Sequence, residues 1–209
     1  MMFQANLHAQ ITNRLQVEMG MARFAKNIGV TDNPEHYDPL VSFTPDVRLN
    51  YAFSKKWNSY LGIRPFNIRL DNVGGLGGED LRVRGAELHL GTRFSPNAHK
   101  KVFLSYGVEI FRASGTFQGS YLTDVPPYCY EVNHKKNFLG FAPSLMLNIK
   151  LGNKVTLFVE TRKRFGTVRI TPLESTQADK PLYGQEYGTV SYWADVYEPI
   201  SAMGLRLVL

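Results

Sequence analysis

Residues 137–161 read NFLGFAPSLMLNIKLGNKVTLFVET, and apolar side chains fall at alternate positions on both sides of a Gly-Asn turn. The apolar positions before the turn are odd-numbered: Leu139, Phe141, Pro143, Leu145, Leu147 and Ile149. After the turn the alternation resumes, again on odd positions, at Val155, Leu157 and Val159. A two-residue period on both sides of a short turn predicts a β-hairpin, with Leu151 paired to Val155 across three residues. Both strands then present their odd positions on one face.

The same alternation recurs along the chain and predicts eight strands. Besides the hairpin, the expected strands cover about residues 7–21, 41–53, 57–70, 86–94, 102–110 and 200–209. Loops are expected at residues 25–40, 71–80, 118–136 and 171–199, and the other connections are short turns. The apolar parity changes at Pro65, so we expect a bulge or kink there. Long and short connections alternate strictly.

The composition suits one all-β domain spanning residues 1–209. The chain has 13 Phe, 11 Tyr and 18 Gly residues, a mixture that favours strands and turns. Its uncharged runs are too short for a transmembrane helix. Cys129 is the single cysteine, which excludes an internal disulfide and leaves either a buried thiol or an intermolecular link. Residues 1–10 lack a complete signal peptide and are either the tail of one or part of an ordinary first strand.

These features predict an eight-stranded antiparallel up-and-down transmembrane β-barrel. Such barrels have short periplasmic turns, longer extracellular loops and termini on the periplasmic side. The alternative is a soluble barrel whose apolar face encloses a ligand. The alternation of connection lengths favours the membrane, as do the aromatic residues Phe53, Trp57 and Phe94 beside the short turns. The net charge of +6 is spread over turns and polar strand faces, so we expect no nucleic-acid partner.

The end of the chain carries a family resemblance. Gly204, Leu207 and Leu209 resemble the C-terminal assembly signal of outer-membrane β-barrels, although the final residue is not aromatic. With its eight strands, the whole chain resembles small outer-membrane barrels of the OmpA/OmpX type. The resemblance implies a Gram-negative outer membrane, with lipid and lipopolysaccharide around the barrel and the barrel assembly machinery as a partner during insertion. It does not fix the function, because one fold hosts several.

Charged residues on the polar strand faces are expected to fill the lumen. The expected interior network comprises Arg14, Glu18, Asp46, Arg48, Arg64, Glu87, His89, Arg93, Glu109, Glu160, Arg162, Arg164 and Arg206. Eight strands enclose room for side chains and little else. Such charges must pair or hold water, because an unpaired buried charge is costly. The favoured interpretation is a salt-bridge network that plugs the barrel, and the alternative is a narrow channel.

The sequence predicts no catalytic, cofactor or metal site. His89, beside Glu87 and across from Glu109, is the nearest candidate for a catalytic group, but it is expected in the periplasmic half of the barrel. Ser114 is expected near the outer end of its strand, and no strand histidine of suitable depth accompanies it. An envelope-lipid hydrolase or acyltransferase therefore remains an alternative rather than the prediction. The histidines are scattered without metal-ligand spacing. No cofactor is expected.

Aromatic residues in the two longest expected loops are candidates for surface interaction. They are Tyr128, Tyr130, Tyr183, Tyr187, Tyr192 and Trp193. Tyr and Trp side chains combine a large contact area with a polar tip, and protein interfaces and glycan-binding sites use this combination. The competing interpretation is an aromatic girdle at the membrane boundary. We expect the loops to serve adhesion, envelope integrity or docking to other outer-membrane proteins.

Overall fold

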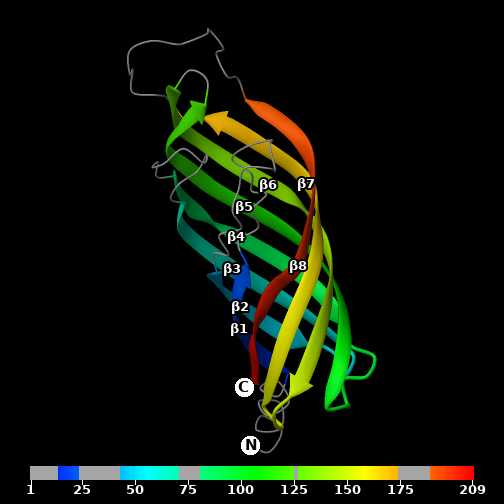
Figure 1. Cartoon of the computed structure of the whole chain (residues 1–209). Helices are drawn as coiled ribbons and strands as arrows, with labels where there is room; N and C mark the ends of the chain where they lie inside the picture. Colours follow the sequence, from blue (N-terminus) through cyan, green and yellow to red (C-terminus); the bar gives the residue numbers. More distant parts are fainter. Residues whose placement is uncertain (1–13, 24–42, 71–80, 125–126, 174–188) are drawn as a thin grey trace, which may run out of the picture.

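The structure is a computed structural model and describes residues 14–23, 43–70, 81–124, 127–173 and 189–209. Its strands are β1 (Leu15–Arg23), β2 (Phe43–Ala52), β3 (Trp57–Leu70), β4 (Leu81–Phe94), β5 (Val102–Asp124), β6 (Pro127–Lys150), β7 (Val155–Pro172) and β8 (Val190–Val208). Each strand pairs antiparallel with the next and β8 pairs with β1, so the strands close into a barrel (Figure 1). The predicted fold class is confirmed. Within the described part of the chain, no helix has the length and hydropathy needed to cross a membrane.

Three short turns lie at one end of the barrel, between β2 and β3, β4 and β5, and β6 and β7. The turn after β6 has the predicted geometry, because the backbone N–H of Leu151 donates to the carbonyl oxygen of Val155 at 3.0 Å. Aromatic rings gather at this end. The Trp57 ring centroid is 4.9 Å from that of Phe94 and 6.5 Å from that of Phe53. These rings begin an aromatic girdle of the kind found at membrane boundaries.

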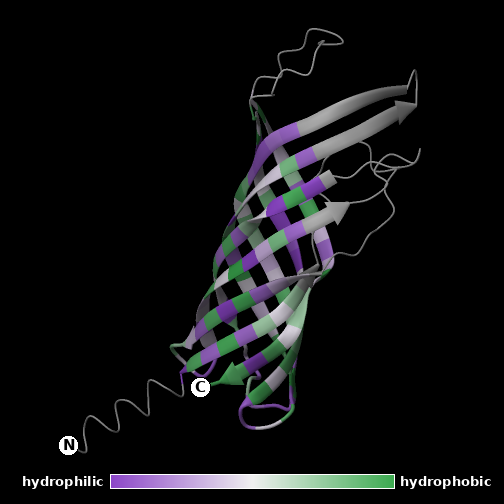
Figure 2. Ribbon diagram, turned by 90° about the vertical axis from the view of Figure 1, so that its left-hand side faces the viewer, coloured by the Kyte–Doolittle hydropathy of each residue, from purple (hydrophilic) through white to green (hydrophobic). Residues whose placement is uncertain are grey.

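The two faces of the barrel wall have opposite chemistry. Outward positions are apolar and exposed, as at Leu61, Ile110, Leu139 and Leu145. Inward positions are buried and mostly polar around the middle of the barrel. Figure 2 shows the resulting alternation of hydrophobic and hydrophilic residues along the strands. So continuous an exposed apolar surface on a monomer is unfavourable in water, whereas the acyl chains of a membrane solvate it.

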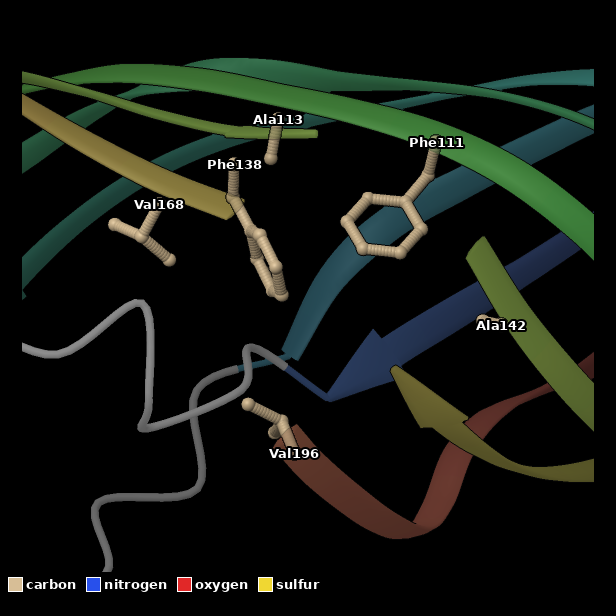
Figure 3. Packing of buried hydrophobic residues seen from close by; sticks show 6 residues of the cluster. All are labelled: Phe111, Ala113, Phe138, Ala142, Val168 and Val196. Carbon is tan, nitrogen blue, oxygen red and sulfur yellow. The ribbon is translucent and has the colours of Figure 1, made fainter. Parts of the chain in front are cut away.

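The interior changes character along the barrel axis. Near the short turns, Ser95, Ser105 and Asn148 form a small hydrogen-bonded group. A layer of charged residues occupies the middle. Beyond this layer, on the side away from the short turns, lies an apolar cluster of Phe111, Ala113, Phe138, Ala142, Val168 and Val196. Figure 3 shows side chains of this cluster pointing into the same space, and the rings of Phe111 and Phe138 meet edge to face at 4.8 Å.

Parts of two expected loops are strands in the structure. Residues 118–136 were expected to form a loop, but β5 and β6 continue as a hairpin until Asp124 pairs with Pro127. Residues 171–199 were expected to form another, but β8 already begins at Val190. The lipid-driven alternation ends where the strands leave the apolar region, so these extensions carry no period-two signal. The expected loops at 25–40 and 71–80, and the start of the first strand, lie outside the described residues.

The prediction of a bulge or kink at Pro65 is wrong. β3 pairs with β4 without a register shift, from Trp57 opposite Phe94 to Leu70 opposite Leu81. Pro65 is exposed and Phe66 is buried, so the strand keeps its facing through this point. The apolar residues of β3 change from odd to even positions here because apolar side chains line the lumen at this level.

The main irregularity among the described strand pairs lies on β8. Glu160 pairs with Ala202, but Arg162, two residues along β7, pairs with Glu198, four residues away on β8. β8 therefore bulges over residues 199–201, where Pro199 has no N–H for the ladder. Side chains bridge the bulge: Thr161 Oγ1 donates to the Glu198 carbonyl at 3.0 Å, and the Ser201 hydroxyl donates to the Glu160 carbonyl at 3.1 Å.

Candidate functional site

The charged middle layer of the lumen is the candidate functional site. Among the described residues it buries equal numbers of carboxylates and guanidinium groups. The acids are Glu18 (β1), Asp46 (β2), Glu87 (β4), Glu109 (β5), Glu160 (β7) and Glu198 (β8). The bases are Arg48 (β2), Arg64 (β3), Arg93 (β4), Arg162 and Arg164 (β7) and Arg206 (β8). Equal numbers of opposite charges allow pairing throughout, which is the condition for burying so many charges.

Ion pairs in this layer cross the lumen between strands that are not neighbours in the barrel. Arg48 Nη2 on β2 lies 2.6 Å from Glu160 Oε2 on β7. Arg93 Nη1 on β4 lies 2.7 Å from Glu18 Oε1 on β1. Glu18 also contacts Arg206 Nη2 at 2.6 Å, and this pair joins neighbouring strands, because Glu18 of β1 is the register partner of Arg206 of β8. Side chains from opposite walls therefore touch in the middle of the barrel, as expected for an interior of this width.

Arg162 contacts carboxylates on three other strands. Its Nη1 lies 2.6 Å from Glu109 Oε1, its Nη2 lies 3.3 Å from Glu87 Oε1, and its Nε donates to Glu198. One guanidinium group thus joins β7 to β4, β5 and β8. Arg164, on the same face of β7, also donates to Glu87. The planar fork of arginine suits several carboxylates at once, which the single ammonium of lysine does less well.

Tyr60 belongs to this network, although the sequence analysis did not assign it to the site. Its side chain is buried, and the hydroxyl donates to Glu109 Oε2 at 2.8 Å. The guanidinium carbon of Arg93 lies 4.1 Å from the centre of the Tyr60 ring, a cation–π contact. Gly91 on β4 leaves room for the ring, because a Cβ there would lie 2.4 Å from it. The sequence does hold a signal for this residue: Tyr60 and Arg64 both stand at even-numbered positions of one strand, so their side chains share its inward face.

The structure buries the predicted interior residues with one exception. Arg14 precedes β1 and is exposed, so its predicted place in the lumen is wrong. Two further buried charges were not predicted: Glu198, which was expected in a loop, and Lys136 on β6. Lys136 lies above the charged layer, with its Nζ 5.7 Å from the ring centre of Phe117. Strand extensions beyond the expected boundaries explain both omissions.

His89 lies in the charged layer between two carboxylates. Its Nε2 is 3.5 Å from Asp46 Oδ1, and its Nδ1 is 3.7 Å from Glu87 Oε1. The ring fits because the wall beside it is a glycine: a Cβ on Gly62 would lie 1.9 Å from Nε2. Among the described residues, no group of three His, Cys, Asp or Glu side chains is placed to hold a metal ion.

The aromatic residues assigned to loops have different locations. Tyr128 and Tyr130 lie on β6, and Tyr192 and Trp193 lie on β8, so their predicted location in loops is wrong. Trp193 is 64% exposed on the barrel wall, which suits the aromatic girdle better than a loop contact. Tyr183 and Tyr187 lie outside the described residues.

The predicted C-terminal signal lies on the last strand and its end. Gly204 pairs with Gly20 of β1, and a Cβ on Gly204 would lie 2.3 Å from the Met19 carbonyl oxygen. This glycine therefore permits the close approach of the closing strands. Leu207 pairs with Val17, and the backbone N–H of Leu209 donates to the Leu15 carbonyl oxygen at 3.1 Å. The segment thus closes the barrel, whatever machinery reads it.

Comparisons with known proteins give the same architecture. Neither the protein-family models nor the curated protein sequences contain a match to this chain. Among solved structures, a major outer membrane protein from Thermus thermophilus is similar, with a TM-score of 0.53 and 11% identity. The match covers 93% of this chain and 98% of that one. Acinetobacter baumannii CarO matches at a TM-score of 0.42 and 11% identity, over 94% of this chain and 97% of that one. The likeness to the Thermus thermophilus protein shows the fold of an outer-membrane β-barrel, and the OmpA/OmpX type stays a prediction.

Proposed function

We propose that this protein is an outer-membrane barrel of a Gram-negative cell with a lumen closed by ion pairs, acting through the end of the barrel away from the short turns. The observation that carries the proposal is the contact of Arg48 with Glu160 across the lumen. Together with the contact between Arg93 and Glu18, it bridges the lumen in two directions at one level. The apolar cluster around Phe111 and Phe138 fills the next level.

The proposed orientation places the short turns in the periplasm. The basic turn residues Lys55, Lys56, Lys100, Lys101 and Lys154 are exposed at that end, where β1 begins and β8 ends. At the other end, β5 and β6 form the longest hairpin, which would project from the cell surface. Surface interaction and adhesion, envelope integrity, and docking to a larger outer-membrane complex are the roles this geometry suits.

The proposal includes no catalytic role. An acyl-transfer site on the barrel wall requires a nucleophile and a base within hydrogen-bond reach of each other. Ser114 faces outward on β5 opposite Asn137 of β6. The ring of His134, three residues from Asn137, stacks on the ring of Phe117. A lipid-modifying enzyme and a narrow channel remain the outcomes that an experiment must separate from the proposal.

Conductance and lipid analysis test this function together. Purified protein in planar bilayers is expected to show no conductance steps, and incubation with lipid A is expected to release no fatty acid. Charge-selective steps in the wild type would establish a channel, and released fatty acid would establish an enzyme. As a positive control, the double variant R48A/E160A removes one bridge across the lumen and is expected to raise leakage.

Epitope insertion tests the orientation. A tag inserted at 125–126, between β5 and β6, is expected to bind antibody on intact cells. A tag between Gly152 and Asn153, in the turn after β6, is expected to bind only after the outer membrane is permeabilised. The reverse pattern would overturn the orientation without affecting the closed lumen.

A further inference from the structure

Cations mark the upper limit of the apolar outer wall on four successive strands. Following each strand away from the short turns, the first outward charged residue is Lys163 on β7, Lys135 on β6, Arg112 on β5 and Arg84 on β4. Apolar residues precede them, with Leu88 on β4, Ile110 on β5 and Leu139 on β6 all exposed. The cations therefore stand where hydrocarbon ends on this side of the barrel.

Strand register places two of these cations close together and a third farther along the strand between them. Arg84 pairs with Thr116 on β5, and Thr116 pairs with Lys135 on β6, so the two cations flank one threonine. Neighbouring strands are about 4.8 Å apart, which puts the two backbones about 10 Å apart, within reach of long side chains. Arg112 lies on the same face of β5, two outward positions nearer the apolar wall. We name Arg84, Arg112 and Lys135 the cation belt.

The three cations of the belt and the fourth cation, Lys163, have different partners. Lys163 Nζ lies 3.0 Å from Asp195 Oδ2 and is neutralised by it. Within the described part of the chain, no carboxylate lies within 4.0 Å of the three belt cations. Arg84 Nε donates to Asn67 Oδ1 at 3.3 Å, which orients its guanidinium without neutralising it. Like charges on neighbouring strands repel each other, and an anion bound between them offsets this repulsion.

The belt covers one side of the barrel. At the same end, the described outward side chains of β8, β1 and β2 include Trp193, Asp195, Met21 and Pro45 but no Lys or Arg. A uniform ring of basic residues would indicate only a general preference for the headgroup region. The described outward cations at this end lie on β4–β7, where Arg169 of β7 is exposed and pairs with Asn137 of β6. A basic face limited to these strands, with Ser114, Thr116 and Asn137 as hydrogen-bonding residues beside the belt, indicates a binding site for a particular anionic group.

We propose that the cation belt binds the phosphate groups of a phosphorylated glycolipid of the outer leaflet, with its acyl chains along the exposed apolar wall of β4–β6. The proposal rests on the orientation given under the proposed function, which places this end in the outer leaflet. Arginine forks bind phosphate oxygens in pairs, and lysine adds a point charge. The position at the end of the apolar wall matches the depth of lipid phosphates.

Binding of lipid A to the purified full chain in detergent micelles tests the proposal, because this assay does not depend on orientation in the cell. The probes are bisphosphorylated lipid A, the same lipid with both phosphates removed, and inorganic phosphate. Each cation near an anionic lipid surface is worth about fivefold in affinity. The variant R84Q/R112Q/K135Q is therefore expected to weaken binding of the bisphosphorylated lipid about a hundredfold. Binding of the dephosphorylated lipid is expected to remain unchanged.

A charge-matched variant at the opposite end gives the control. K100Q/K101Q/K154Q removes three exposed lysines from the short turns and is expected to change the affinity less than twofold. Equal losses in the two variants, or no loss in the belt variant, would overturn the proposal. Binding of inorganic phosphate as tight as that of the lipid would also overturn it. If the triple variant does not fold, R112Q alone should lose about fivefold and R84Q/K135Q about 25-fold.

Discussion

Arg48 Nη2 and Glu160 Oε2 lie 2.6 Å apart, although β1 and β8 lie between β2 and β7 in the barrel wall. Backbone hydrogen bonds connect each strand only to its two neighbours, so they cannot fix the distance across the lumen. Ion pairs such as this one can. The contact therefore acts as a strut between walls, and it occupies the space that a conducting path would need.

Removing one partner of this strut should destabilise the barrel strongly. E160Q leaves Arg48 and Arg93 buried with less compensating charge, and breaking a buried pair in this way costs about 3–5 kcal/mol. Urea unfolding in detergent, followed by the shift of the folded band on gels, measures the loss. D195N breaks an exposed pair with Lys163 and should cost at most about 1 kcal/mol. Equal midpoints for E160Q and wild type would contradict the structural role of the strut.

A methyl group at Gly62 should conflict with His89. The Cβ of G62A would lie 1.9 Å from Nε2 of a buried ring held near Asp46 and Glu87, so the ring has little room to move. Overpacking of this kind costs about 1–3 kcal/mol. In an H89A background the same G62A change should cost much less, and a double-mutant cycle measures the difference.

The control for this cycle is G152A, in the turn after β6, where a Cβ would meet nothing within 4 Å. G152A should leave the unfolding midpoint unchanged. If G62A costs the same with and without the imidazole ring, the packing of His89 against Gly62 is not the cause.

The barrel could be predicted from sequence because lipid imposes a strict period of two on each strand that crosses it. The hairpin at 137–161 shows this period, and the structure confirms both its facing and its turn. Where strands continue past the apolar wall, neither face meets lipid, and the pattern disappears. For this reason the hairpin ends around Asp124 and Pro127, and the start of β8 at Val190, were not predicted.

The charged layer was predicted as a set but not as a network. The alternation of inward and outward positions alone assigns Arg48 and Glu160 to the lumen. Which of these side chains pair depends on how the barrel closes and how its strands are staggered, and no local sequence pattern encodes this. Glu198 was missed because Pro199 and its acidic neighbours resemble a loop, and a bulge is needed to keep this residue in the strand. Phe66 shows the converse error: an apolar residue can face a lumen that is itself apolar at that level.

Lipid exposure of the outer wall can be measured directly. A fluorescent label on a cysteine at Leu145, in a C129S background, should be quenched strongly by brominated acyl chains because this side chain lies on the exposed apolar face. The same label at Asn153, in the turn, should be quenched weakly by those lipids. A protein that stays soluble without detergent and shows equal quenching at both sites would exclude a membrane-spanning barrel.

The imidazole of His134 should titrate below its ordinary range. His134 lies on β6 one residue before the cation belt's Lys135, beyond the apolar wall, and its ring stacks on Phe117 with centroids 5.1 Å apart. Burial lowers the pKa of His134 below 6.5, and the nearby Lys136 ammonium lowers this pKa further. A histidine NMR titration in micelles, with H134Q for assignment, should therefore give a midpoint under pH 6.5.

This shift also sets a direction for stability. Because the folded state holds the proton less tightly than the unfolded state, the His134 contribution is fully present above pH 6.5 and is lost as the pH falls through the folded pKa. K136M removes the neighbouring charge and should move the midpoint upward, whereas K135Q, on the outward face, should move it less. A wild-type midpoint at or above 6.5, or one unmoved by K136M, would contradict the packing of His134 between Phe117 and the end of the lumen.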